Sequence, residues 1–109
     1  MTKIIEDYKK LLAERQALHL EDDYGIEENN KKAVEILSSN LDDVIDFIEN
    51  ECSYEDFVWM SEIFDDLWLE YKKQGVQNKF AIAVNKANKK FVSQGFKDLE
   101  DFVPYIEEE

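Results

Sequence analysis

Apolar residues recur every three or four positions along most of this chain, which is the spacing of amphipathic helices. Three glycines and one proline leave little material for β-turns and favour helices joined by short loops. Residues 20–29, which contain Asp22, Asp23 and Gly25, are predicted to form a loop. The predicted helices span residues 3–19, 30–38, 41–50, 54–73 and 77–92, with a short one from Asp98 to about Ile106.

This pattern predicts an all-α fold in one domain over residues 1–109, with five or six helices. Two architectures are compatible with it. One is a compact bundle. The other is a short α-solenoid of stacked helical hairpins, because residues 30–51 match residues 88–109 at nine of twenty-two positions.

Charge is distributed unevenly. Lys72–Lys97 contains seven lysines and no acid, so it contributes +7 to the net charge of −13 and leaves −20 for the rest. A strongly acidic protein repels nucleic acid and anionic membranes and attracts basic protein surfaces. Seven lysines without arginine, next to −20 elsewhere, make a poor phosphate-binding face. They either neutralise neighbouring acidic helices or solvate their own helix.

Two predicted helices carry acidic faces. On the helix that follows Asn40, the apolar residues share one side, and the opposite side presents Asp42, Asp43, Asp46 and Glu49. On the longest helix, Trp59 projects opposite the core stripe, in the company of Glu55, Glu62, Asp66 and Glu70. An exposed Trp among carboxylates is typical of an interface with a basic partner. In the alternative interpretation, another helix, such as the lysine-rich one, covers Trp59.

Catalytic chemistry is hard to assemble from this sequence. One histidine and one cysteine occur, without a nucleophile elbow, a phosphate-binding glycine loop or ligands at zinc spacing. His19 is interpreted as a packed or capping residue. Cys52 is interpreted as a small buried hydrophobe whose acidic neighbours raise its pKa. We therefore expect no enzyme activity, metal, cofactor or small-molecule substrate.

The expected compartment is the cytoplasm. A lone cysteine cannot form an internal disulfide, and the N-terminus does not resemble a signal peptide. No apolar run is long enough to span a bilayer.

The segment from Asn50 to Leu67 (NECSYEDFVWMSEIFDDL), with the helix before it, resembles small acidic all-helical immunity proteins of bacterial contact-dependent growth inhibition and polymorphic toxin systems. The resemblance covers about 30 of 109 residues and does not extend beyond Leu67. It implies a cytoplasmic inhibitor that binds a toxin domain, often a basic nuclease, and blocks its active site or substrate groove.

Charge and resemblance together predict an immunity protein whose acidic helical face neutralises a basic toxin nuclease. The carboxylates would steer the partner and bind its Lys and Arg side chains, with Trp59 as the desolvated anchor. The alternative is a phage- or plasmid-borne DNA mimic that inhibits a host or defence nuclease. A third class is a structural adaptor that oligomerises through apolar faces, and its contacts should hardly respond to salt.

Overall fold

The computed structural model describes residues 2–106, which form six α-helices and one π-helical turn and contain no strand. The predicted all-α fold class is therefore confirmed. In chain order the elements are α1 (Lys3–Ala17), α2 (Asp23–Leu37), α3 (Leu41–Asp46), η1 (Phe47–Glu51), α4 (Tyr54–Ser61), α5 (Phe64–Lys73) and α6 (Gln77–Ser93).

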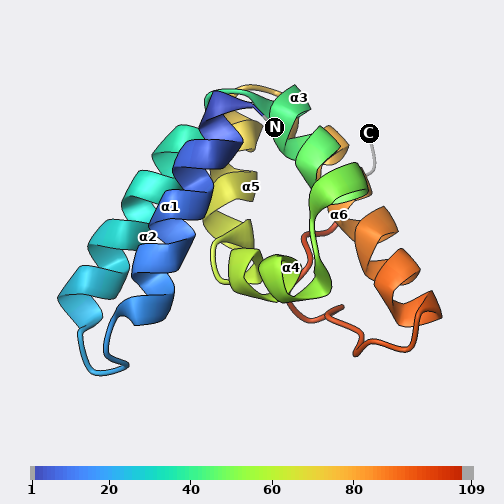
Figure 1. The fold of residues 1–109 in the computed structure, drawn as a ribbon. Helices are drawn as coiled ribbons and strands as arrows, with labels where there is room; N and C mark the ends of the chain where they lie inside the picture. Colours follow the sequence, from blue (N-terminus) through green and yellow to red (C-terminus); the bar gives the residue numbers. More distant parts are fainter. Residues whose placement is uncertain (1, 107–109) are drawn as a thin grey trace.

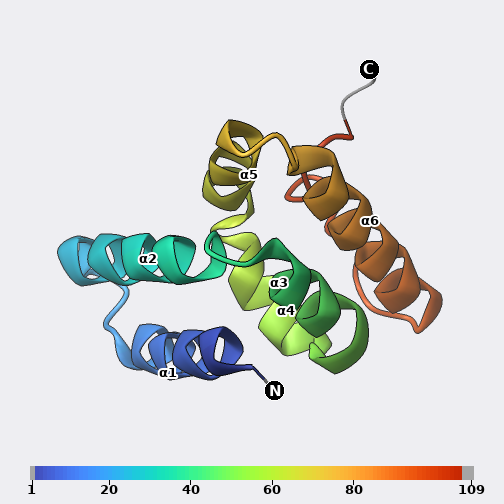
Figure 2. The same cartoon turned by 90° about the horizontal axis from the view of Figure 1, so that it is seen from above.

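The helices are arranged as an arch (Figure 1). α1 and α2 form an antiparallel hairpin on one flank, and α6 lies on the other (Figures 1 and 2). α5 stands between α2 and α6 and contacts both. The radius of gyration is 13.5 Å, close to the value of about 13 Å for a compact domain of this length. Of the two predicted architectures, the structure matches the helical bundle.

A cluster of aromatic side chains forms the centre of the core. Phe57, Phe64 and Phe80 are completely buried and meet edge to face, with ring centroids 5.3 Å apart for Phe57 and Phe64 and 5.9 Å apart for Phe64 and Phe80. Tyr71 packs on Phe80, and its hydroxyl donates a hydrogen bond of 2.8 Å to the carbonyl of Leu37. The core therefore joins α4, α5 and α6 and ties them to the end of α2.

The predicted loop over residues 20–29 is wrong in most of its length, because α2 begins at Asp23. The Asp22 carboxylate caps this helix by accepting a hydrogen bond of 2.9 Å from the Gly25 amide. A Cβ on Gly25 would stand 2.6 Å from that carboxylate, so glycine leaves room for the cap. The Asp-Asp-Tyr-Gly sequence starts a helix here.

The predicted continuous helix over residues 54–73 is also wrong, since it breaks between α4 and α5. The amides of Glu62 and Ile63 bond to carbonyls three residues back, which ends α4 in a tight turn. Ile63 has a non-helical backbone (φ −114°, ψ 8°) and is 3% exposed. The break therefore buries both Ile63 and Phe64, and it redirects α5 relative to α4.

The short helix predicted from Asp98 does not form within the described residues up to Ile106. The Asp98 carboxylate accepts bonds from Asn88 and from the Glu100 amide, and the Leu99 amide donates to Asn88. Asn88 thus holds residues 98–99 against α6, and the following residues form turns. The second copy of the suggested repeat consequently lacks the helix that the first copy has as α3.

Candidate functional site

The first predicted acidic face lies on α3 and η1 at the surface. Asn40 caps α3 by accepting a hydrogen bond of 3.3 Å from the Asp43 amide. Because Leu41 and Val44 are buried on the inner side, Asp42 and Asp46 are exposed, while Asp43 and Glu49 are partly exposed. Asp46 accepts a hydrogen bond of 2.8 Å from Asn50, which leaves its charge uncompensated. The predicted distribution of charge on this helix is confirmed.

The second predicted face is divided by the break between α4 and α5. Glu55 on α4 is exposed. Glu62 instead pairs with Arg15 of α1, with guanidinium-to-carboxylate distances of 3.0 and 3.2 Å. Asp66 and Glu70 lie on the redirected α5 and face a different part of the molecule. The five residues predicted to share one face thus belong to separate environments.

Trp59 is partly buried against the core and is not the open Trp that the helical projection suggested. The Arg15 guanidinium lies over its ring, 5.2 Å from the centroid, and Arg15 itself is only 9% exposed. The alternative interpretation, that another helix covers Trp59, is therefore correct. The covering helix is α1 and not the lysine-rich α6.

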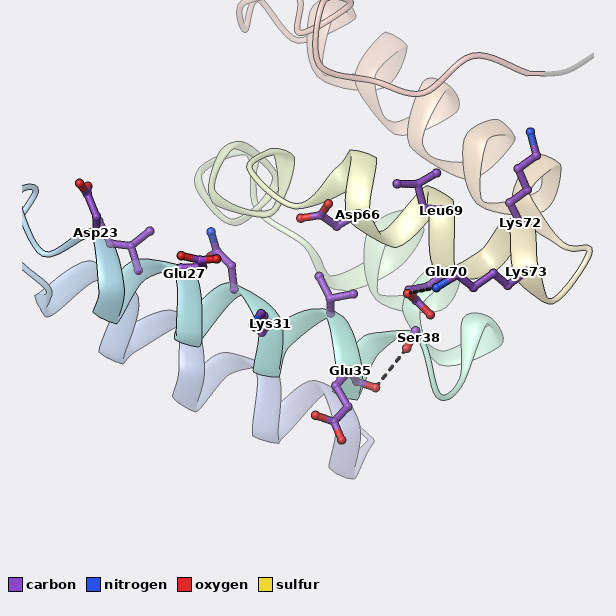
Figure 3. A pocket seen from close by; sticks show the side chains of 13 residues that line it. Asp23, Glu27, Lys31, Glu35, Ser38, Asp66, Leu69, Glu70, Lys72 and Lys73 are labelled. Carbon is purple, nitrogen blue, oxygen red and sulfur yellow. Dashed lines mark hydrogen bonds and ion pairs between the residues drawn. The ribbon is translucent and has the colours of Figure 1, made fainter.

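Asp66 and Glu70 line a groove between α2 and α5 (Figure 3). The groove has a volume of about 950 Å³ and is open to solvent. α2 contributes one stripe along its full length, from Asp23 to Ser38, and α5 contributes the opposite side. Apolar lining comes from Ile26, Val34 and Leu69, and carboxylates come from Asp23, Glu27, Glu35, Asp66 and Glu70.

The lysines that line the groove make ion pairs or a cation–π contact with neighbouring side chains. Three lysines line the groove: Lys73 pairs with Glu70 at 2.9 Å, Lys31 pairs with Glu28 at 4.0 Å, and Lys72 lies over the Trp68 ring at 4.8 Å. In Figure 3 the Lys72 side chain extends away from α2. Within residues 2–106, the other four lining carboxylates, on Asp23, Glu27, Glu35 and Asp66, make no ion pair. The groove is therefore an acidic surface with an apolar centre.

The lysines of α6 do not neutralise the acidic helices. Lys79, Lys86, Lys89 and Lys90 are exposed, and none of them has an acidic partner in the part of the chain that the structure describes. Of the two interpretations of the basic segment, solvation of their own helix is the one that these four lysines match, whereas Lys73 pairs with Glu70.

The reactive residue types have structural roles. Burial, and then the Asp56 carboxylate, raise the pKa of Cys52 to about 12. The predicted direction is confirmed, although the acid responsible is Asp56 and not its nearer neighbours in sequence. His19 accepts a hydrogen bond of 3.1 Å from the Glu21 amide in the α1–α2 turn, as a capping residue would.

Within residues 2–106, no group of three or more His, Cys, Asp and Glu side chains is arranged to hold a metal ion. No described helix has both the length and the apolar character needed to cross a bilayer.

The helical pattern did not predict the groove. The two walls of the groove come from segments about 35 residues apart, and the sequence pattern predicts a loop for the N-terminal part of the α2 wall. One local signal points to it: Leu69 lies away from the core stripe of its helix and is 51% exposed. A large apolar residue on a polar helix face often marks a contact surface.

Comparison with family models, with curated protein sequences and with solved structures finds no match for this chain. The surface chemistry of the described residues is therefore the basis for assigning a function.

Proposed function

We propose that this protein is an immunity-type inhibitor, which binds a basic toxin domain, a nuclease by preference, and neutralises it. One observation carries the proposal: carboxylates on three successive helices are exposed and make no ion pair with a lysine or arginine of the described residues. The predicted site residues of this kind are Asp42, Asp46, Glu55 and Asp66.

The mechanism is electrostatic and steric. A nuclease binds the phosphates of its substrate with Lys and Arg side chains, and a fixed array of carboxylates can occupy the same side chains. Long-range attraction between unlike charges speeds the encounter, and the bulk of the inhibitor then excludes the substrate. Trp59 and Glu62 are engaged by Arg15, so the proposal places the first contacts on the four exposed carboxylates.

A variant in which these four carboxylates are neutralised tests the proposal, with the product of the gene directly upstream as the partner. The variant combines Asp42→Asn, Asp46→Asn, Glu55→Gln and Asp66→Asn. Its association rate, measured by stopped-flow fluorescence at low salt, should fall by about tenfold or more, because steering depends on local charge. Raising the salt concentration should slow the wild type far more than the variant.

The control removes the same amount of charge elsewhere, through Glu6→Gln, Glu14→Gln, Glu100→Gln and Asp101→Asn, all at exposed positions. Its association rate should fall by only about twofold. Equal effects in the two variants would show that net charge alone matters. A chain that does not bind its genetic neighbour but inhibits a host or defence nuclease would belong to the DNA-mimic class.

A further inference from the structure

The apolar face of α2 is only partly covered within residues 2–106. Ala33 and Leu37 on this face are buried, whereas Ile26, on the same face, and Val34, at its edge, line the groove and are partly exposed. On the α5 side of the groove, Leu69 is 51% exposed. The apolar face of α2 is therefore wider than the part that the rest of the described chain buries.

Charge surrounds this apolar centre. Asp23 and Glu27 lie near the N-terminal end of α2, and Asp66 faces the same space from α5 (Figure 3). These carboxylates make no ion pair in the described residues, whereas Lys73 is paired with Glu70 and Lys31, which also lines the groove, with Glu28. An apolar strip with unpaired acids along its edges complements an apolar stripe with basic flanks.

The dimensions match a helix. The groove follows the fifteen residues of α2, which correspond to about 23 Å at 1.5 Å per residue. A segment of about 15 residues in helical form has that length and presents apolar side chains at i, i+3, i+4 and i+7 along one face. An extended peptide would have no free strand edge to join, since residues 2–106 contain no strand.

From these features we infer that the α2–α5 groove binds an amphipathic basic helix of the partner protein. Its apolar stripe packs on Ile26, Val34 and Leu69, and its Lys or Arg side chains bond to Glu27 and Asp66. This inference rests on the proposed function for the identity of the partner, and it specifies where and in what form the partner docks.

The groove is tested apart from any toxin with a synthetic peptide of about 16 residues. The peptide carries leucines in helical register and lysines elsewhere. Its binding is followed by fluorescence anisotropy at near-physiological salt. A second peptide of the same composition, scrambled so that its leucines lose the helical register, measures purely electrostatic attraction. Methyl resonances of Ile26, Val34 and Leu69 report whether the peptide occupies the groove.

Two pairs of variants separate groove binding from general attraction. Leu69→Ser should weaken binding of the register-correct peptide by about tenfold, whereas Ile82→Ser, on α6 and equally 51% exposed, should leave it unchanged. Asp66→Asn should weaken binding by about threefold to tenfold, whereas Asp65→Asn, its exposed neighbour outside the groove, should not. Circular dichroism and urea unfolding verify that each variant is folded.

Any of the following three outcomes would overturn the inference. Equal binding of both peptides, or equal loss in both members of a pair, would mean that acidity alone attracts the peptide, and the proposed inhibitor function would survive. Absence of binding by the register-correct peptide would remove the groove as a helix site. Self-association in sedimentation velocity that Leu69→Ser abolishes would assign the groove to a second copy, whose exposed α6 lysines would be the basic element.

Discussion

Arg15 connects α1 to α4 through a single side chain. Its guanidinium makes a bidentate contact with Glu62, and its flat face covers the Trp59 ring. Because Arg15 is 9% exposed, its charge has little water around it and depends on Glu62 for compensation. Arginine suits this place since its planar group can bond at the edge and stack at the face.

Loss of the carboxylate at residue 62 should therefore destabilise the fold. We expect Glu62→Gln to lower the free energy of unfolding by about 1–2 kcal/mol, a value reduced by the partial exposure of Glu62. Urea unfolding followed by circular dichroism measures this change. Glu55→Gln removes the same charge from the same helix without breaking an ion pair, and it should stay within about 0.5 kcal/mol of the wild type. Equal stabilities of the two variants would contradict a structural role for the pair.

Sequence patterns could predict the exposed carboxylates of α3 but not the surroundings of Trp59. The projection of Asp42 and Asp46 depends only on helical pitch and on the burial of Leu41 and Val44, which their sequence spacing indicates. The contact between Trp59 and Arg15 joins residues 44 positions apart. Such contacts depend on how the helices pack, and a single sequence does not contain that information in a local pattern.

At the scale of elements, helix ends were predicted well where glycine determines them. Gly75 and Gly95 have positive φ angles of 75° and 93°, and each ends the helix before it. In both cases the amide of the residue after the glycine bonds to the carbonyl five residues back, as in a Schellman motif. Two boundaries away from glycine differ from the prediction: the Asp22 cap starts α2 early, and Asn88 holds residues 98–99 against α6 where the pattern predicts a helix.

A substitution at Asn88 tests how residues 98–99 are held against α6. Asn88→Ala removes the acceptor of the buried Leu99 amide, and leaving such a group unsatisfied costs about 1–3 kcal/mol. We expect hydrogen exchange to accelerate mainly in residues 96–106, because other contacts of α6 remain. Asn50→Ala, which breaks an exposed bond to Asp46, should leave that segment's exchange unchanged. Faster exchange across all helices alike would show that Asn88 stabilises the core as a whole.

The whole molecule carries a net charge of −13 on 109 residues. Since most carboxylates of residues 2–106 are at the surface and few of these have basic partners there, their mutual repulsion opposes the compact state. Salt screens this repulsion. Raising NaCl from about 10 to about 150 mM should therefore stabilise the fold by on the order of 1 kcal/mol, which is about 5 °C in Tm.

Differential scanning calorimetry measures that shift. The quadruple variant at Glu6, Glu14, Glu100 and Asp101 should respond less to salt, because fewer like charges remain. A Tm independent of salt would mean that the acidic surface is compensated by ions or contacts that the charge distribution does not reveal.

The protonated state of Cys52 has a practical consequence for these experiments. A thiol with a pKa near 12 exists almost entirely as the unreactive acid at neutral pH, whereas an ordinary surface thiol is a few per cent thiolate. A cysteine introduced at an exposed position would thus react with maleimide dyes orders of magnitude faster than the native one. Single-fluorophore derivatives can be prepared without mutating Cys52, so labelling leaves the packing around α4 untouched.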